Sequence, residues 1–389
     1  MGKKLLIIHG GAPSPVLNAS LLGAIRQAKR TESITEVMGA IGGAEGVLRE
    51  RFARLDTLSG TELEKLACTP GTAIGTSRYA IREEDYHLMT EIFLRRGIGY
   101  VLLNGGNGTM NTCGKLHEAC AGHGICIVGI PKTVDNDIAV TDHTPGFGSA
   151  ARYLAGITQE IGEDVFSLPI HVSIIEAMGR NAGWLSAASA LAKKRAGDAP
   201  HLIYLPERPF REERFLEDVE KAWKKREGVV VVASEGLRGE DGEPIVKPAL
   251  QNERAVYFGE VGSHLAGLVT GKLGLKARSE KPGICGRSSV PWISRTDQEE
   301  AILAGGEAVR AVVDGKSGFM VGLMREEGGA EYAVHTEMIP IERVMLFERK
   351  MPDSFINEEG NGVTDAFLTW CRPLIGGELP DMIRLKERR

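Results

Sequence analysis

Short apolar runs rich in Val and Ile alternate along most of the chain with longer amphipathic segments. The runs are largely apolar on both faces, which is typical of parallel strands that helices cover on both sides. This alternation predicts an α/β fold built on doubly wound, mainly parallel sheets. The predicted strands are 5–8, 100–103, 125–130, 172–175, 202–205 and 229–233. The predicted helices are 17–29, 85–96, 148–161, 181–195, 212–226, 257–272 and 298–314.

The overall charge argues against some classes of partner. Lys and Arg number 47 against 52 Asp and Glu, a formal net charge of −5, whereas proteins that bind nucleic acids or membrane surfaces usually carry a basic excess. No apolar run approaches the roughly 18 residues that can span a bilayer. Six cysteines without a CxxC pair fit reduced thiols better than a disulfide framework. The sequence therefore predicts a cytoplasmic protein with no nucleic-acid and no membrane partner.

Glycine is the unusual part of the composition, at 49 of 389 residues against roughly 7% on average. No Gly/Ser linker accounts for the excess, and several glycines directly follow predicted strands: Gly10, Gly11, Gly105, Gly106 and Gly108. In doubly wound sheets, ligands bind at the carboxyl ends of the strands. Glycine at such places leaves backbone N–H groups open to a ligand, and these groups bind anions where a helix begins. The loop after strand 100–103 is neither a Walker A loop nor a dinucleotide-binding fingerprint, which disfavours a dehydrogenase.

The loop after strand 125–130 carries the most chemistry. Lys132, Thr133, Asp135 and Asp137 lie within six positions of one another. Phosphoryl transfer uses such groups, because one carboxylate orients or deprotonates the attacking hydroxyl, a cation neutralises charge on the moving phosphoryl group, and a second carboxylate helps to hold Mg²⁺. An Asx-rich turn that caps a helix is the structural alternative.

Taken in order, these loops closely resemble those of the phosphofructokinase family. The segments that carry the resemblance are 10–11, 75–78, 105–109, 131–137, 178–180 and 233–236, within roughly residues 3–325. The resemblance implies two Rossmann-like lobes with mainly parallel sheets. It implies a donor-binding lobe of 1–146 plus about 285–335, a sugar-binding lobe of 147–284, and a C-terminal segment of about 336–389.

The resemblance also implies a sugar kinase of glycolysis, which transfers a phosphoryl group from ATP or pyrophosphate to a sugar hydroxyl, most simply the 1-hydroxyl of fructose 6-phosphate. Asp135 would accept the proton of that hydroxyl. The implied assembly is a homodimer or homotetramer with substrate sites at subunit contacts. The implied catalytic residues are Asp135, Arg180, Lys132 and Arg78, and the implied Mg²⁺ ligands are Asn107 and Asp137. The implied donor-binding residues are Gly11, Arg78, Gly106, Asn107, Gly108 and Thr109. The implied substrate-binding residues are Thr133, Asp135, His171, Met178, Gly179, Arg180, Glu235, Arg278 and Arg287.

The donor loop departs from the family pattern. Its usual Gly-Gly-Asp is replaced by Gly-Gly-Asn, and Asn107 removes one negative charge from a site for a hard cation. Pyrophosphate-using members resemble this chain in their lysine at the place of Lys132, but they carry an aspartate at the place of Gly108, which blocks the space of the ATP α-phosphate. Gly108 leaves that space open and favours ATP, with pyrophosphate as the close alternative.

The predicted acceptor site departs further. His171 stands where the family has an arginine that reaches across a subunit interface to the sugar 6-phosphate, and Ile284 stands where a histidine or tyrosine would bind the same phosphate. Isoleucine cannot donate a hydrogen bond, and histidine is only partly charged near neutral pH. Arg278 and Arg287 are left to bind the phosphate. Another sugar phosphate, an unphosphorylated sugar or polyol, or a non-catalytic homologue that binds sugar phosphate or nucleotide are the alternatives.

Overall fold

The chain divides into two units. The computed structural model describes residues 2–226, 228–247, 250–252, 255–257, 260–326, 328 and 331–385. The first unit consists of Met1–Ala150, Leu250–Tyr257 and Ile284–Lys350. The second consists of Ala151–Ala249, Phe258–Gly283 and Met351–Arg389.

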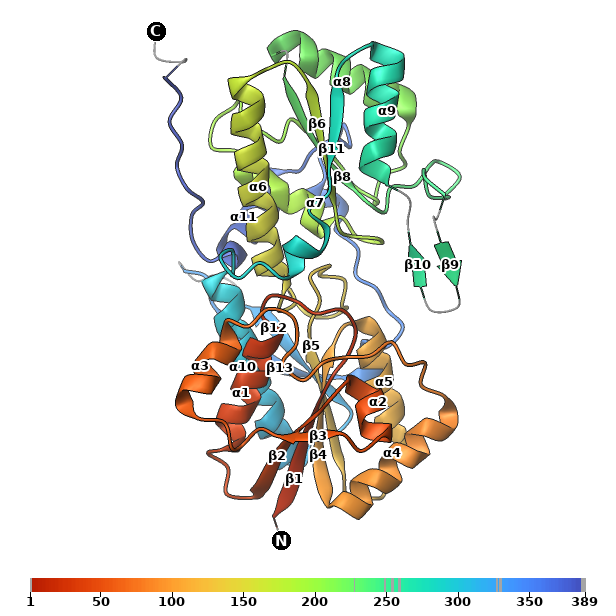
Figure 1. The fold of residues 1–389 in the computed structure, drawn as a ribbon, viewed down its shortest axis with the longest axis vertical. Helices are drawn as coiled ribbons and strands as arrows, with labels where there is room; N and C mark the ends of the chain where they lie inside the picture. Colours follow the sequence, from red (N-terminus) through yellow and green to blue (C-terminus); the bar gives the residue numbers. More distant parts are fainter. Residues whose placement is uncertain are drawn as a thin grey trace. The chain divides into compact units, whose positions relative to one another are not determined.

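The first unit is built on a seven-stranded sheet (Figure 1). Its strand order is β13-β12-β5-β4-β1-β2-β3, and the five inner strands are parallel while β3 and β13 pair antiparallel at the two edges. The strands are β1 (Lys3–His9), β2 (Ile34–Ala40), β3 (Phe52–Arg54), β4 (Ile98–Gly105), β5 (Cys126–Pro131), β12 (Phe319–Arg325) and β13 (Val334–Pro340). A short antiparallel pair, β9 (Leu250–Asn252) and β10 (Ala255–Tyr257), forms a separate sheet.

Helices cover both faces of this sheet because successive strand residues point to opposite sides. In β1, Leu5 and Ile7 pack toward α1 (Leu17–Ala28), α3 (Gly60–Ala67) and α10 (Arg295–Val313). Leu6 and Ile8 pack toward α2 (Gly43–Leu48), α4 (Glu83–Arg96) and α5 (Asn107–Ala119). The residues on both faces of β1 are buried, which explains why this strand is apolar throughout.

Glycine lets α1 and α10 approach closely. A Cβ on Gly305 would lie 2.0 Å from the Ser20 carbonyl oxygen, and one on Gly23 would lie 2.0 Å from the Ile302 carbonyl oxygen. By contrast, the nearest atoms to a Cβ on Gly306 would be 3.9 Å away. Part of the glycine excess therefore serves helix packing rather than ligand binding.

Two alanine substitutions at neighbouring positions test this packing. Gly305→Ala is expected to lower the free energy of unfolding by roughly 1–3 kcal/mol, because backbone must move to admit the methyl group. Gly306→Ala is expected to raise it by about 0.5–1 kcal/mol through helix propensity alone. Urea unfolding of the two variants measures both changes, and equal stabilisation by both would contradict the close contact.

The second unit is built on a four-stranded parallel sheet of order β11-β6-β8-β7. Its strands are β6 (Val172–Ala177), β7 (Leu202–Tyr204), β8 (Val229–Ser234) and β11 (Ala277–Glu280). One face packs against α8 (Glu212–Arg226) and α9 (Val261–Leu273), while α6 (Phe147–Ser167) and α7 (Trp184–Ala188) lie on the other side (Figure 1).

The C-terminal residues of the second unit pack through aromatic rings. Trp184 of α7 lies with its ring centroid 4.9 Å from that of Trp370 in α11 (Asp365–Cys371) and 6.1 Å from that of Phe355. Trp184 and Phe367 are fully buried. Residues beyond 350 are thus part of the core of this unit.

The predicted α/β fold with mainly parallel sheets is confirmed, and each predicted strand corresponds to β1, β4, β5, β6, β7 or β8. The predicted helix 181–195 is wrong in its extent. The structure has α7, then a 3₁₀ turn at Ser189–Ala192, and there the helix ends. The Asp198 carboxylate accepts hydrogen bonds from the backbone N–H groups of Lys194 and Arg195 at 3.0 and 2.8 Å, which holds those residues in a loop instead.

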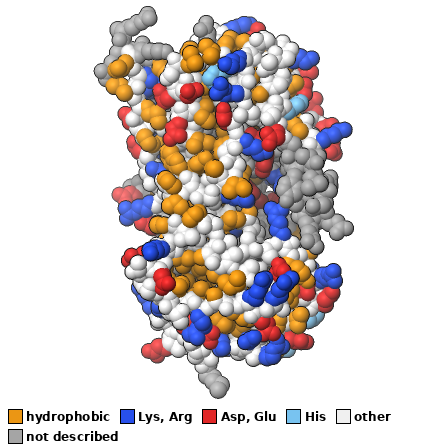
Figure 2. All heavy atoms as spheres, in the orientation of Figure 1, with side chains coloured by type: hydrophobic (Ala, Val, Ile, Leu, Met, Phe, Trp, Pro, Cys, Tyr) orange, Lys and Arg blue, Asp and Glu red, His pale blue; other side chains and the backbone are white. Residues whose placement is uncertain are grey.

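The surface agrees with the modest net charge. Charged side chains of both signs are interspersed over the face seen in Figure 2. Within the described part of the chain, no helix combines the length and the apolar character needed to cross a bilayer.

Candidate active site

Three loops of the first unit meet at the carboxyl edge of its sheet, after β1, β4 and β5. His9 and Asn104 are register partners at the ends of β1 and β4. Thr109 lies between these two loops, since a Cβ on either Gly10 or Gly105 would lie 2.2 Å from its Oγ1 atom. The third loop joins them because the Lys132 N–H donates to the Gly105 carbonyl at 3.0 Å.

Lys132 lies beneath the glycine loops and is 4% exposed. Its ammonium group donates to the Ala12 carbonyl at 2.5 Å, and a Cβ on Gly11 would lie 3.8 Å from its Nζ atom. Burial lowers the pKa of Lys132 to about 8, although Asp135 and Asp137 partly oppose that shift. Lys132 therefore brings a positive charge to the loops predicted to bind the donor phosphates.

Asn107 and Asp137 lie together at the start of α5. The Asn107 Nδ2 donates to the Asp137 carbonyl at 3.3 Å. The buried Oδ1 of Asn107 finds no hydrogen-bond partner among the residues that the structure describes. Burial, followed by the charges of Asp135 and Glu348, raises the pKa of Asp137 to about 7. An amide oxygen without a partner and a crowded carboxylate are groups that a hard cation would satisfy.

Asn136 lies in the chain between the two carboxylate residues Asp135 and Asp137. It is fully buried and has a left-handed backbone with φ of 54°. Its Oδ1 accepts a hydrogen bond from the Thr144 N–H at 3.0 Å. Before Asn136 in the chain, the Asp135 N–H donates to the Thr133 hydroxyl at 3.1 Å. Asn136 was not among the residues predicted for the site, and its signal in the sequence is only its place between Asp135 and Asp137.

Gly108 lies in the first turn of α5, and a Cβ there would meet no described heavy atom within 4 Å. The space that the donor argument requires is therefore open in the first unit. Helix α5 also begins here without a side-chain cap, which leaves its first N–H groups available to an anion.

Two predicted arginines belong to the first unit. Arg287 lies close enough to Lys132 to contribute to lowering its pKa, and its buried Nε atom has no hydrogen-bond partner within the described ranges. Arg78 is exposed and directly follows Ser77. A Cβ on Gly43 would lie 2.7 Å from the carbonyl oxygen of His9 and 3.3 Å from the backbone N of Ser77. The residue before Arg78 therefore lies close to the end of β1.

The second unit brings two loops together at the carboxyl ends of β6 and β8. The Ser234 hydroxyl donates to the Gly179 carbonyl at 2.6 Å, and the Glu235 N–H donates to the Ala177 carbonyl at 2.9 Å. Glycine is required at 236, because a Cβ there would lie 1.9 Å from the carbonyl oxygen of Arg180. Burial raises the pKa of Glu235, and a backbone hydrogen bond from Gly179 and the charge of Arg180 oppose it. Met178, Gly179, Arg180 and Glu235 thus share one end of this sheet.

His171 and Arg278 lie at the opposite, amino end of β6. His171 directly precedes β6, and Arg278 of β11 pairs in register with Ser173. His171 is 3% exposed and its Nδ1 lacks a hydrogen-bond partner among described residues. Burial, reinforced by the charge of Arg278, lowers its pKa. At about 3.3 Å per residue, the six residues of β6 separate these two side chains from Met178–Arg180 within one copy of this unit.

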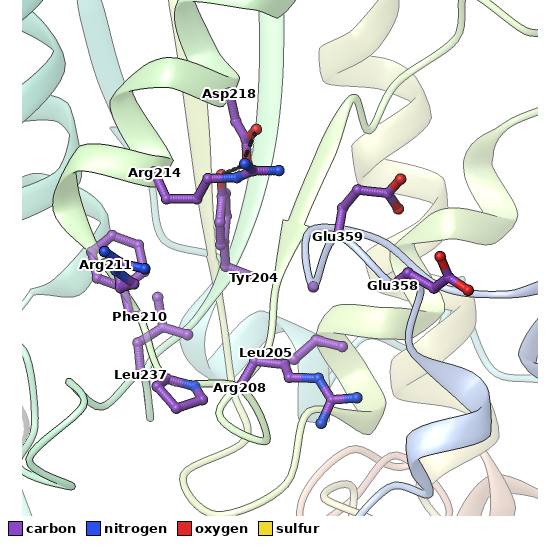
Figure 3. A pocket seen from close by; sticks show the side chains of 12 residues that line it. Tyr204, Leu205, Arg208, Phe210, Arg211, Arg214, Asp218, Leu237, Glu358 and Glu359 are labelled. Carbon is purple, nitrogen blue, oxygen red and sulfur yellow. Dashed lines mark hydrogen bonds and ion pairs between the residues drawn. The ribbon is translucent and has the colours of Figure 1, made fainter.

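The second unit also contains a pocket of about 200 Å³ (Figure 3). Its polar wall is internally paired, since Arg214 lies 3.4 Å from Asp218, which also accepts a hydrogen bond from the Tyr204 hydroxyl at 3.0 Å. Arg208 pairs with Asp353 at 2.9 Å. None of the residues predicted to bind donor, sugar or metal is among the described residues that line this pocket.

Comparison with known proteins identifies the family of the chain. Residues 4–312 match the family model described as phosphofructokinase. The chain is 37% identical to the pyrophosphate–fructose 6-phosphate 1-phosphotransferase of Rhodospirillum rubrum, over 99% of the chain and 97% of the relative. It is 34% identical to the sulfofructose kinase of Alkalicoccus urumqiensis, over 96% and 95%. The crystal structure of the pyrophosphate-dependent phosphofructokinase from Marinobacter aquaeolei matches with a TM-score of 0.88 at 33% identity, over 98% of this chain and 94% of that one.

These relatives match the present chain over nearly its full length. Most of the segments that carry the resemblance lie at the carboxyl ends of parallel strands in the two sheets. The chain therefore belongs to the phosphofructokinase family and is a phosphotransferase that uses an alcohol group as acceptor.

Proposed function

We propose that the protein transfers a phosphoryl group from pyrophosphate to the 1-hydroxyl of fructose 6-phosphate. The observation that carries this proposal is the convergence of Lys132, Asp135 and Asp137 with two glycine loops at one edge of the first sheet. Full-length relatives at 33–37% identity carry the name of that reaction. A cytoplasmic enzyme of glycolysis fits this chemistry.

Asp135 is the proposed base. In phosphoryl transfer the attacking hydroxyl is oriented by a carboxylate that accepts its proton, while fixed cations neutralise the charge on the moving group. Lys132 and Arg78 supply positive charge in the first unit, where Gly11, Gly106, Gly108 and Thr109 are proposed to bind the donor phosphates. Thr133 is proposed to contact the sugar in the same loop.

The second unit supplies the remaining proposed sugar contacts. Met178, Gly179 and Glu235 are proposed to bind the sugar hydroxyls, and Arg180 to bind a phosphoryl group. Burial raises the pKa of Glu235 because it disfavours the charged carboxylate. A hydrogen bond from a sugar hydroxyl would stabilise that charged form.

Magnesium is the proposed cofactor, and the residues present fit it. Asn107 Oδ1 and the Asp137 carboxylate would hold it, since the first lacks a partner among described residues and the second is crowded by other carboxylates. Bound Mg²⁺ supplies charge neutralisation to donor phosphates. Mg²⁺ is commonly bound through one or two carboxylates and keeps several waters.

A homo-oligomer is proposed from the place of His171 and Arg278. They lie at the amino end of β6, whereas Met178–Arg180 lie at its carboxyl end. If His171 and Arg278 bind the sugar 6-phosphate, as the resemblance implies, they do so in the site of another copy. Arg287 belongs to the first unit and is proposed to contact the same phosphate.

A sulfonated sugar is the second candidate for the acceptor. One relative of comparable identity is named a sulfofructose kinase. His171 stands where the resemblance has an arginine, and burial together with the charge of Arg278 lowers its pKa and so favours its neutral form. A site with one positive charge fewer suits a singly charged sulfonate better than a phosphate, whose second ionisation lies near pH 6.

Initial rates with fructose 6-phosphate and with 6-deoxy-6-sulfofructose, each with pyrophosphate and with ATP, decide between the acceptors. A higher kcat/KM for the sulfonate would replace the first candidate.

The donor is tested at Gly108. ATP stays the alternative donor because the space beside this residue is open. Gly108→Asp is expected to lower kcat/KM for ATP at least about tenfold, which corresponds to a loss of about 1.4 kcal/mol in the transition state. The same substitution is expected to leave kcat/KM for pyrophosphate within threefold of wild type. Gly108→Ala is the control for helix propensity. Unchanged use of ATP by Gly108→Asp would contradict the steric argument.

A further inference from the structure

A buried, ion-paired histidine lies behind the loop that carries Asp135 and Asp137. His143 is 1% exposed, its Nε2 lies 2.6 Å from the Glu300 carboxylate, and its Nδ1 lies 2.8 Å from the Asp142 carboxylate. Carboxylate oxygens can only accept, so both ring nitrogens donate and the ring is an imidazolium. Burial alone would lower the pKa of His143, but Glu300 and then Asp142 outweigh burial and raise it to about 9.

The two partners of His143 lie far apart in the sequence. Asp142 is its neighbour in the loop between β5 and α6, whereas Glu300 lies on α10. The Tyr332 hydroxyl donates to the other oxygen of Glu300 at 2.6 Å, and Arg325 lies 3.3 Å from Asp142. The imidazolium is therefore a charged link between the loop and a helix that packs on the sheet.

The residue after His143 contacts the centre of the proposed catalytic loop. Thr144 donates its backbone N–H to the Asn136 side chain at 3.0 Å and its hydroxyl to the Thr133 carbonyl at 2.9 Å. The Thr133 N–H donates in return to the Pro145 carbonyl at 3.2 Å. Residues 144–145 thus form a frame for Thr133 and Asn136, and Asn136 directly separates the two carboxylates.

Helix α10 holds this frame at a second place. Asp297 lies three residues before Glu300, on the same face of the helix. Its carboxylate accepts from the Gly146 N–H at 2.8 Å and from the Ser149 N–H at 2.9 Å. Segment 143–149 is therefore held to one helix face at both of its ends, by Glu300 through His143 and by Asp297 directly.

We propose that His143 is a positioning residue for phosphoryl transfer: by joining Asp142 to Glu300 it fixes the frame that sets Asp135 and Asp137. Among the described residues, the side-chain partners of His143 are Asp142, Glu300 and Tyr332, none of which is proposed to touch substrate, so the effect of His143 passes through Thr144 and Asn136. This inference rests on the proposed roles of Asp135 and Asp137. The site residues predicted from the sequence do not include His143, Thr144, Asp297 or Glu300.

Two substitutions of His143 separate the link to α10 from the contact within the loop. His143→Asn places an amide near the Nδ1 position, so it keeps the bond to Asp142 and loses Glu300. His143→Gln places its amide near the Nε2 position and keeps a donor for Glu300. We expect kcat to fall at least about tenfold in His143→Asn with the acceptor KM within threefold, and to stay within threefold of wild type in His143→Gln. Tyr332→Phe removes the hydroxyl that donates to Glu300 at 2.6 Å and lies 3.4 Å from His143 Nε2, but it keeps both charged partners of His143, so it is expected to lower kcat less than His143→Asn does.

A second measurement does not depend on turnover. Hydrogen exchange of the backbone amides of 133–146 is expected to be at least about tenfold faster in His143→Asn than in His143→Gln. If wild type turns over no substrate pair, the proposed function fails while this exchange result still decides the role of His143. If His143→Asn does not fold, Glu300→Asp, which withdraws the carboxylate by one methylene, is expected to show the same loss of kcat and the same faster exchange. Wild-type kcat and exchange in a folded His143→Asn, or equal losses in the Asn and Gln variants, would overturn the proposal.

Discussion

Asp135→Asn is expected to lower kcat by roughly 10²- to 10⁴-fold, the range over which a positioned general base contributes. The amide keeps the size of the side chain but cannot accept the proton of the sugar hydroxyl. Binding of pyrophosphate, measured by calorimetry, is expected to stay within threefold of wild type, because the glycine loops and Lys132 are unchanged. Turnover comparable to wild type would remove Asp135 from the role of base.

The neighbouring frame distinguishes a chemical from a structural effect of this substitution. The Asp135 N–H, which donates to Thr133, is unaffected by the change, and the Asn136–Thr144 contact does not involve the replaced group. Asp135→Asn is therefore expected to leave hydrogen exchange across 133–146 at its wild-type rate.

Lys132→Met is expected to lower kcat/KM for the donor by roughly 10²- to 10³-fold, as when one fixed donor is removed from a charge-stabilising site. Methionine has a similar length but neither charge nor a donor for the Ala12 carbonyl. Lys115→Met is the matched control, because Lys115 of α5 pairs with the exposed Glu83 at 3.3 Å and lies 5.6 Å from the centre of the Tyr86 ring, away from the glycine loops. Exposed ion pairs of this kind contribute little. A Lys132→Met enzyme with kcat/KM within threefold of wild type would contradict the proposed role.

The same lysine predicts an alkaline limb in the pH profile. The pKa of Lys132 in the structure is about 8, so its charge is present below that pH and is lost as the pH rises through it. Since kcat/KM reports groups of the free enzyme, wild-type kcat/KM for the donor is expected to decline above about pH 8. Lys132→Met is expected to lack that decline while keeping any acidic limb.

The central strands and the loops after them could be predicted because their signals are local. The apolar runs of β1, β4 and β5 can be read residue by residue, and the glycines and carboxylates that follow each run mark the ligand edge. Strands β2, β3 and β9 to β13 were not predicted. In β2 and β13 polar residues interrupt the apolar pattern, as Glu36 does in β2, where it pairs with Lys4 at 3.1 Å.

The supporting contacts of the site could not be predicted, because they join residues far apart in the chain. His143 meets Glu300 and Gly146 meets Asp297 across more than 150 positions. Nothing in the sequence near Asn136 indicates that Thr144 holds it in a left-handed conformation. The burial of Lys132 and the open space beside Gly108 likewise depend on how β1, β4 and β5 are paired, not on the loops alone.

The protein is proposed to transfer a phosphoryl group to a sugar hydroxyl at the loop that carries Asp135. The most direct test incubates the wild-type protein with Mg²⁺, pyrophosphate and fructose 6-phosphate and follows the products by ³¹P NMR. We expect a new phosphate-monoester signal of fructose 1,6-bisphosphate together with one equivalent of orthophosphate, and we expect the new signal to be absent with Asp135→Asn. No new ester with pyrophosphate or ATP, for either acceptor, from a folded protein that still binds these ligands would contradict this proposal.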